Sequence, residues 1–517
     1  MSALPGGRLI MRLVSTPLAA PLRLPDPRAG HALADLREAI IPGPGVEALL
    51  PALADPDLLV VTTGQQAGLF TGPLYTIHKA LSAAALAARL AEQWGRPVRP
   101  IFWVAGDDHD HAEAATVAWL TGDGDLEEAR LPPRPPDAPM LPMYRERLGE
   151  GLVVARERLV DALPRTPHRD WVADWLTRHY QPDQSVAGAC GHALAELLAP
   201  LGVACLDPTH PVFKRASAPH LLRALRASAD LDTLLNEEAR RLEAAGHEIP
   251  VPVGDGATLV FLEDRLGRDR LVRDGDGFVT RRGGDRYSLA ALEELAARDP
   301  QRLSANVLLR PVLESALLPT VAYLGGPGEL RYFRMTGPVY EQLGVPRQAP
   351  LPRWSGMVVE PFVDRILAKF GASIEELLAP GQSLERRVIR SQVPADLSEA
   401  LTELEREATR LFDRVLPAAV GIDPTLERPV EGARRQVLWA GRDLGRKVLS
   451  RLRAREAVEL RQVARARTAL RPLGHSQERI LTVAPFLARH GPDFLAAVRE
   501  AAADHYAGAL EGAASRP

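Results

Sequence analysis

The stretch LLVVTTGQQAGLFTGPLYTIHKALSAAALAARLAEQW, residues 58–94, contains the pattern that decides the fold. Its first residues, LLVVTT, form an apolar, β-branched run that stops at Gly64, as in a buried strand of a parallel sheet. A glycine-rich loop follows. Pro73 then begins an alanine- and leucine-rich segment that predicts a helix to Trp94, because proline is tolerated at the first helical position. A strand, a tight loop and a helix are therefore expected in succession.

Three further segments repeat this arrangement. VRPIFWVA at 98–105 ends before an acidic segment, GVACLD at 202–207 ends before Pro208, and LPTVAYL at 318–324 ends before a glycine loop. Four strand–loop–helix units of this kind predict an open α/β sheet. Ligands of such sheets bind beyond the C-terminal ends of the strands, so we expect these loops to meet at one site.

Two insertions interrupt the predicted sheet. Residues 131–184 begin with a proline-rich stretch and continue with helical patterns. Residues 214–305 begin with helices and continue with three short strands that predict an antiparallel meander. The sheet domain is then expected to comprise residues 1–130, 185–213 and 306–382.

The C-terminal part, residues 383–517, has a different character. Apolar residues alternate in steps of four and three at Leu397, Leu401, Leu404, Ala408, Leu411 and Val415. After GIDPTLERP, the same spacing restarts at Ala433, Val437, Ala440 and Leu444. Such spacing is typical of a coiled-coil seam, so the two segments predict an antiparallel helical hairpin.

The composition argues against several classes of protein. The 517 residues have a net charge of −3, which disfavours a domain that neutralises many nucleic-acid phosphates. No apolar stretch is long enough to span a membrane, and the N-terminus lacks the apolar core of a signal peptide. Cys190 and Cys205 have no metal-ligand spacing and suggest no disulfide framework, so we expect buried thiols in a cytoplasmic protein.

The loop after the first strand is a candidate phosphate- or carboxylate-binding site. The residues in question are Gly64, Gln65, Gln66, Gly72, His78 and Lys79. Glycines permit close backbone approach, and the free N–H groups of the helix that begins at Pro73 face the loop. The segment matches neither the P-loop nor the dinucleotide fingerprint. An equal alternative is that the glycines serve only a tight turn and that Lys79 is solvated.

The acidic segment AGDDHDHAEA at 105–114 is the candidate catalytic site. The proposed catalytic residues are Asp107, Asp108, His109 and Asp110. Carboxylates and imidazoles this dense can bind a metal or provide a general base. No second ligand cluster accompanies them, so we expect no structural metal. The alternative is a polar loop that caps a helix, but its position after a strand favours chemistry. An extended backbone would direct only alternate members into the pocket.

A third candidate loop is YLGGPGEL at 323–330. The residues expected to line the substrate pocket are Gly325, Gly326, Gly328 and Glu329. The alternative is a purely structural turn.

Two long strings, TGQQAGLFTGPLYTIHKA at 63–80 and PIFWVAGDDHDHAEA at 100–114, closely resemble the bacillithiol biosynthesis cysteine-adding enzymes. Further matches follow in order at 206–208, 306–311, 318–329 and 477–494. The resemblance implies a Rossmann-like core related to the class I nucleotidyltransferases, with two connecting-peptide insertions. It also implies a C-terminal antiparallel coiled coil that forms a homodimer.

The resemblance further implies a reaction, in which L-cysteine is joined through its carboxyl group to the glucosamine amine of glucosaminyl-malate. This is the last step of bacillithiol synthesis. Amide formation from a free carboxylate needs activation, so ATP with Mg²⁺ is the expected source of energy. GPLYTIHK resembles the phosphate-binding element of class I sheets, with His78 and Lys79 in the charged positions. LPRWSG at 351–356 offers Arg353 in place of a signature lysine.

Two alternatives to this reaction remain open. The first is that the chain is another class I-like ligase, which acts on a different amino acid or acceptor. The second is that it is a coiled-coil dimer that binds a nucleotide without catalysis.

Overall fold

The structure is a computed structural model that describes residues 11–18, 22–23 and 27–514. The chain divides into two compact units. Among the described residues, one unit comprises those within 13–358 and 475–514 and contains the predicted sheet, and the other comprises 359–474 with 11–12. The two units are described separately below.

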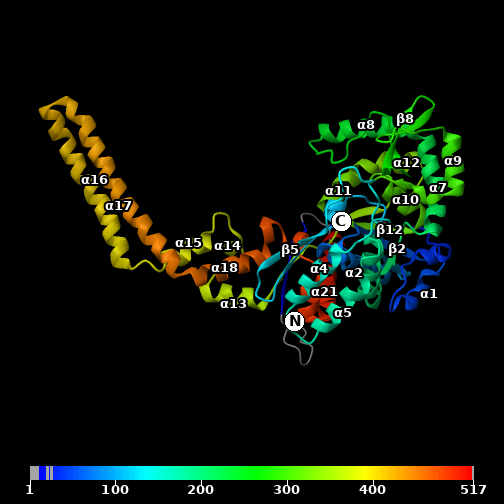
Figure 1. Cartoon of the computed structure of the whole chain (residues 1–517), viewed down its shortest axis with the longest axis horizontal. Helices are drawn as coiled ribbons and strands as arrows, with labels where there is room; N and C mark the ends of the chain where they lie inside the picture. Colours follow the sequence, from blue (N-terminus) through cyan, green and yellow to red (C-terminus); the bar gives the residue numbers. More distant parts are fainter. Residues whose placement is uncertain (1–10, 19–21, 24–26, 515–517) are drawn as a thin grey trace. The chain divides into compact units, whose positions relative to one another are not determined.

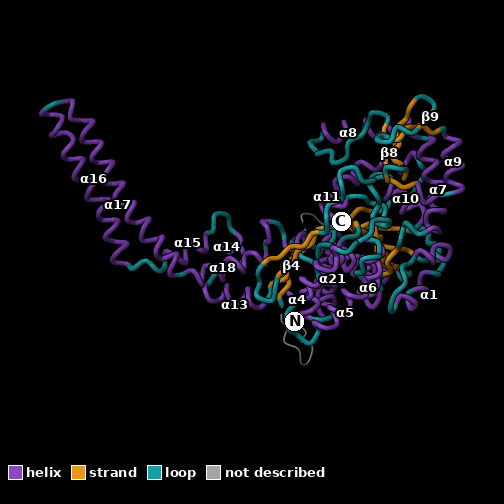
Figure 2. The backbone as a smooth tube through the Cα atoms, in the orientation of Figure 1, coloured by secondary structure: helices purple, strands orange, loops and turns teal. Residues whose placement is uncertain are grey.

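The first unit is built on a five-stranded parallel sheet with the order β13-β12-β2-β3-β6. Figure 2 colours the strands of the chain orange and its helices purple. Its strands are β2 (Leu59–Gln66), β3 (Val98–Ala105), β6 (Ala204–Leu206), β12 (Thr320–Gly325) and β13 (Ala349–Pro352). The chain builds β2, β3 and β6 toward one edge and then returns to add β12 and β13 on the other side of β2. This reversal between β2 and β12 is the switch point at which doubly wound sheets bind ligands. The predicted Rossmann-like class is confirmed.

The edge strand β13 is absent from the sequence prediction. Its sequence is APLP, and two prolines in four residues argue against a strand in the middle of a sheet. Because β13 pairs only with β12, the missing N–H groups can be tolerated there. The four predicted strands are confirmed with shifted ends, and β2 continues three residues beyond Thr63.

Helix α2 (Tyr75–Trp94) follows β2 and begins two residues after the predicted Pro73. It packs against α21 (Asp493–Ala514), close to the end of the chain. The Tyr506 hydroxyl donates to the Pro352 carbonyl at 3.0 Å, which ties α21 to β13. In this structure the residues from His475 onward pack with the sheet, whereas the prediction places all of 383–517 in one C-terminal domain.

The first insertion contains α4 (Gly151–Ala162) and α5 (Arg169–His179), as its helical patterns predict. Before it lies an unpredicted hairpin of β4 (Thr116–Leu120) and β5 (Leu126–Arg130). The second insertion has α7 (Pro211–Arg226) and α8 (Ser228–Ala244) and then an antiparallel sheet. The predicted meander is present as β7 (Ala257–Asp264), β8 (Gly267–Asp274) and β9 (Gly277–Thr280), and β10 (Arg286–Tyr287) and β11 (Leu303–Ala305) extend it.

The second unit is helical. It contains α13 (Pro361–Phe370), α14 (Ile374–Leu378), α15 (Ser383–Arg390), α16 (Ala395–Ile422), α17 (Glu427–Arg455) and α18 (Ala457–Leu470). The predicted hairpin is confirmed, with α16 and α17 side by side (Figure 1). The unit begins before the predicted boundary at residue 382, because it includes α13 and α14.

The seam of this hairpin differs from the predicted one. On α17, Gly441 and Gly445 lie nearest to Leu404 and Leu401 of α16, since a Cβ on Gly441 would lie 3.3 Å from Leu404 Cδ2. The predicted row on α17 is instead exposed at Ala433, Val437, Ala440 and Leu444. Glycine lets the α16 leucines approach the α17 backbone, which turns the larger apolar side chains of α17 outward. Within the described part of the chain, no helix has both the length and the apolar character needed to cross a membrane.

Candidate active site

A cavity of about 520 Å³ opens at the C-terminal edge of the parallel sheet. The loops after β2, β3 and β12 line one part of it, and α7, β7, β8 and β11 of the second insertion line another. A cavity of this size suits a small-molecule ligand. The three predicted loops therefore meet at one cavity.

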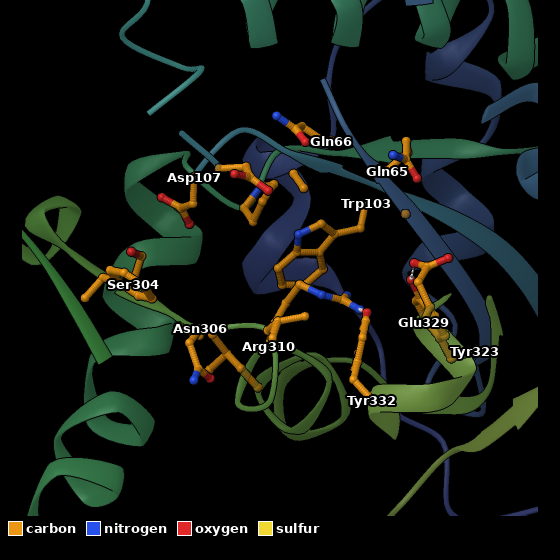
Figure 3. A pocket seen from close by; sticks show the side chains of 18 of the residues that line it. Gln65, Gln66, Trp103, Asp107, Ser304, Asn306, Arg310, Tyr323, Glu329 and Tyr332 are labelled. Atoms are coloured by element: carbon orange, nitrogen blue, oxygen red, sulfur yellow. Dashed lines mark hydrogen bonds between the residues drawn. The ribbon is translucent and has the colours of Figure 1, made fainter. Parts of the chain in front are cut away.

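Figure 3 shows how the side chains are distributed around this cavity. Trp103 and Arg310 lie centrally, with Asp107, Ser304 and Asn306 toward one side and Gln65, Tyr323 and Glu329 toward the other.

Gly64 occupies a position on β2 where a side chain does not fit. A Cβ there would lie 2.8 Å from the Trp103 carbonyl oxygen and 2.9 Å from Trp103 Cβ, its partner on β3. Gln65 and Gln66 follow and line the cavity, and Gln65 Nε2 donates to the Tyr75 hydroxyl at 2.9 Å. Gly72 has a φ of 71° and lies in the turn before α2, outside the cavity lining.

Lys79 lies at the floor of the cavity and is buried. Its ammonium group donates to Gly64 O at 2.9 Å and to Gln65 Oε1 at 2.8 Å, and it forms an ion pair with Glu329 at 2.5 Å. Burial lowers the pKa of Lys79, an effect that the Glu329 carboxylate opposes. The alternative of a solvated lysine is wrong. Its charge is paired with Glu329, which links α2 to α11 (Pro327–Phe333), the helix that follows β12.

The predicted glycine loop meets Lys79 through Glu329. Gly326, Gly328 and Glu329 line the cavity, whereas Gly325 ends β12 behind it. Glu329 accepts hydrogen bonds from the Gly326 N–H at 2.8 Å and from the Tyr323 hydroxyl. Burial alone would raise the pKa of Glu329, but Lys79 and these donors hold it below its ordinary value.

His78 does not reach the cavity. Its ring is fully buried, packs edge-on against Trp354 with centroids 4.7 Å apart, and bonds through Nδ1 to Glu478 at 2.9 Å. Burial lowers the pKa of His78, which keeps the ring neutral, so Nδ1 carries the proton that it donates. The structure thus separates His78 from Lys79, which neighbours it in sequence. One projects into the protein and the other toward the cavity floor.

The side chains of the acidic segment do not alternate between the cavity and the protein interior, as an extended backbone would predict. The consecutive residues Asp107 and Asp108 both line the cavity, whereas His109 and Asp110 do not. Asp108 Oδ1 accepts the backbone N–H groups of His109 at 2.6 Å and Asp110 at 3.1 Å, so the backbone turns rather than extends. Asp110 caps the short helix α3 (His111–Ala114) by accepting the Glu113 N–H.

Two cations of the second insertion hold this loop. Lys214 donates to Asp107 Oδ1 at 2.6 Å, and Arg268 donates to His109 Nδ1 at 3.1 Å. Burial and the charge of Arg268 lower the pKa of His109 to about 4. Because a guanidinium can only donate, His109 Nδ1 is occupied as an acceptor.

Arg310 is a cavity residue that the sequence did not single out, although NVLLRP contains it. Its guanidinium lies 5.0 Å from the Tyr323 ring centroid and 5.8 Å from that of Trp103. It donates to Glu314 at 2.7 Å and to the Tyr332 hydroxyl at 3.2 Å. Lys214 and Arg268 likewise line the cavity and lie in no motif named above. Arg479 also lines it and lies in the matching string at 477–494, but that string gave no reason to single it out.

The cavity thus presents charges of both signs. Its carboxylates are Asp107, Asp108, Glu113 and Glu329, and its cations are Lys79, Lys214, Arg268, Arg270, Arg310, Arg353 and Arg479. Such walls suit a ligand that combines an amine with carboxylate or phosphate groups. Among the described residues, no group of three or more His, Cys, Asp or Glu side chains is arranged to hold a metal ion.

Comparison with known proteins agrees with this architecture. Residues 32–354 match the family described as bacillithiol biosynthesis BshC, N-terminal Rossmann-like domain, and residues 356–506 match its C-terminal coiled-coil domain. The chain is 32% identical to a protein of Heliobacterium modesticaldum, over 87% of this chain and 82% of that protein. It is 33% identical to one of Koribacter versatilis, over 86% and 81% of the respective chains. Both relatives carry the name cysteine ligase BshC. The chain therefore belongs to the BshC family of bacillithiol biosynthesis.

Proposed function

We propose that this chain is a cysteine ligase that joins the carboxyl group of L-cysteine to the glucosamine amine of glucosaminyl-malate, with ATP as the source of energy. The observation that supports it most is the cavity at the switch point, where Asp107 and Asp108 share one space with Arg310 and Arg479. The proposed substrates carry an amine and several carboxylates between them. Both kinds of group find opposite charges in this cavity.

The acidic loop is proposed to bind and deprotonate the amine, which must be neutral to attack. Asp107 is already paired with Lys214, and the acceptor nitrogen of His109 is occupied by Arg268. Glu113 is a better candidate for the base. Its carboxylate lines the cavity, and burial together with Asp110 and Asp108 raises its pKa, which strengthens it as a proton acceptor.

The cationic side of the cavity is proposed to hold phosphate and carboxylate groups. Arg310 and Arg479 are the residues that suit this role. The Lys79 ammonium uses its three donors on Gly64, Gln65 and Glu329, whereas Arg310, although paired with Glu314, uses only two of its five N–H groups in the contacts given above. ATP, bound with Mg²⁺, would supply the activation that a free carboxylate lacks. His78 is too far inside the protein to contact a phosphate directly, so we assign it no part in binding.

The proposal includes a homodimer in the cytoplasm. Leu411 and Val415 on α16 and Val437 and Leu444 on α17 are 41–50% exposed, which leaves apolar surface for a second hairpin. Cys190 and Cys205 are buried free thiols, in keeping with a reducing compartment.

Mass spectrometry of the purified protein with glucosaminyl-malate, L-cysteine and ATP tests the proposal. We expect a product whose mass is the sum of the two substrates less one water, and only when all three compounds are present. A product with a different amino acid in place of cysteine would indicate another ligase. Nucleotide binding without any product would indicate a non-catalytic protein. Either result contradicts the proposal.

A further inference from the structure

The short segment Ser476–Arg479, which follows the helical hairpin in sequence, contributes to the same cavity as the loops of the sheet. Arg479 lines the cavity and is exposed, with no side-chain hydrogen bond or ion pair within the described residues. Its neighbour Glu478 is buried, with 6% of its side chain exposed, and points to Arg353. Arg479 thus faces the cavity, while the preceding residue, Glu478, binds a second arginine, Arg353.

Glu478 orients Arg353 through a bidentate ion pair. Arg353 Nη1 and Nη2 donate to the two carboxylate oxygens at 2.8 and 2.7 Å. Ser355 Oγ at 2.8 Å and His78 Nδ1 at 2.9 Å donate to the same carboxylate. Burial alone would raise the pKa of Glu478, but the hydrogen bonds from His78 and Arg353 and the charge of Arg353 hold it far below the ordinary value. A planar guanidinium whose Nη1 and Nη2 atoms both bind one carboxylate is fixed in one orientation.

This arrangement does not use the Nε–H of Arg353. The side chain is only 5% exposed, yet Nε has no hydrogen-bond partner within the described residues. Nε lies 3.9 Å from the position of a Cβ on Gly326, which also lines the cavity, and the guanidinium is 5.6 Å from the Tyr75 ring centroid. A buried, unpaired N–H of a cation is unfavourable unless a ligand accepts from it.

We infer that Arg353 and Arg479 form a subsite for an anionic oxygen group, and that Glu478 and His78 are positioning residues that hold Arg353 in it. The chemistry suits a phosphate or a carboxylate, both of which bind guanidinium groups. In the reaction proposed above, on which this inference rests, the anion is either the triphosphate of ATP or a carboxylate of one substrate. His78 thus acts on the ligand only through Glu478 and Arg353.

Calorimetric titration of the full-length protein tests the subsite, with Mg·ATP, L-cysteine and glucosaminyl-malate titrated separately. We expect R479Q and E478Q each to raise the Kd of the same one of these ligands by about tenfold or more, as for loss of a charge-assisted hydrogen bond. That ligand identifies the anion. R479K, which keeps the charge, should raise the same Kd less. A general defect in folding would instead weaken all three ligands together.

R499Q is the matched control, because Arg499 on α21 is exposed and does not line the cavity. Its three Kd values should stay at the wild-type level. Unchanged affinities in R479Q and E478Q, or an equal loss in R499Q, would overturn the subsite. If E478Q fails to fold, the Kd values of R479Q, whose substituted side chain is exposed, decide whether the subsite exists. Product formation by the wild type is measured separately, so a wild type that makes no product contradicts the proposed function without affecting the subsite.

Discussion

Neighbouring side chains at residues 107–110 of the acidic segment have different structural roles. Asp107 and Asp108 face the cavity, whereas Asp110 accepts the N–H of Glu113 and holds a helix end. The sequence located this segment correctly, because a dense acidic run after a buried strand is a local signal. It could not assign the roles, since the turn made by Asp108 depends on backbone conformation.

This division predicts unequal effects of substitution. D107A and D108A should each lower kcat/KM by about tenfold or more, because each removes a cavity carboxylate that is proposed to bind the substrate amine. D110A should lower kcat/KM only slightly, through the pKa of Glu113, and lower the free energy of unfolding by about 1 kcal/mol, as for loss of a helix cap. Steady-state kinetics and urea unfolding of the three variants would show this. Equal small losses of activity in all three would mean that the segment only shapes the loop.

Lys79 is the residue for which burial changes the expectation most. A lysine one turn inside a helix ordinarily contributes little to stability. Here its side chain is 2% exposed and paired with Glu329, so its removal leaves a carboxylate without its counter-charge. K79M should lower the free energy of unfolding by about 3 kcal/mol, and K79M/E329Q should recover part of that loss. Urea unfolding of both variants provides the measurement, and a K79M protein as stable as the wild type would refute the buried pair.

At the scale of elements, the contact between β2 and β3 places the cavity residues of both strands. Gly64 is required there by close approach, because an added Cβ would overlap the backbone of Trp103. G64A should displace Trp103 and lower the free energy of unfolding by about 1–3 kcal/mol, with a loss of activity. G122A is the matched control, since a Cβ on Gly122 meets nothing closer than 4.0 Å. Similar stability and activity in both variants would show that β2 and β3 tolerate the extra atom.

The helical hairpin is the element expected to form the dimer. Leu404 is 45% exposed, although it packs toward Gly441 of α17. L404E should convert a dimer into monomers, because a charge in an apolar interface is unfavourable. V154E on α4, where Val154 is 61% exposed, is the control and should keep the wild-type mass. Light scattering measures the mass directly, and a wild type with the mass of one chain would rule out the dimer.

For the whole molecule, the sequence predicted the features that repeat or alternate locally. Four strands, the meander and the hairpin were expected at nearly the observed positions. The proline-containing edge strand β13 and the return of the chain to the sheet after residue 474 were not, because neither has a strong local pattern. The same limit applies to the site. Arg353 and Glu478 are 125 positions apart, and His78 and Glu478 are 400 apart, so only the folded chain brings them together.

In the proposed reaction, this cavity forms an amide from the carboxyl group of cysteine at the expense of ATP. L-Cysteine labelled with ¹⁸O in both carboxylate oxygens tests it most directly, in a reaction with glucosaminyl-malate and ATP followed by mass spectrometry. We predict that the amide product keeps one ¹⁸O and that the other is found in AMP or in inorganic phosphate, depending on which group activates the carboxylate. A product that forms without ATP, or label in neither AMP nor phosphate when product forms, would contradict the account.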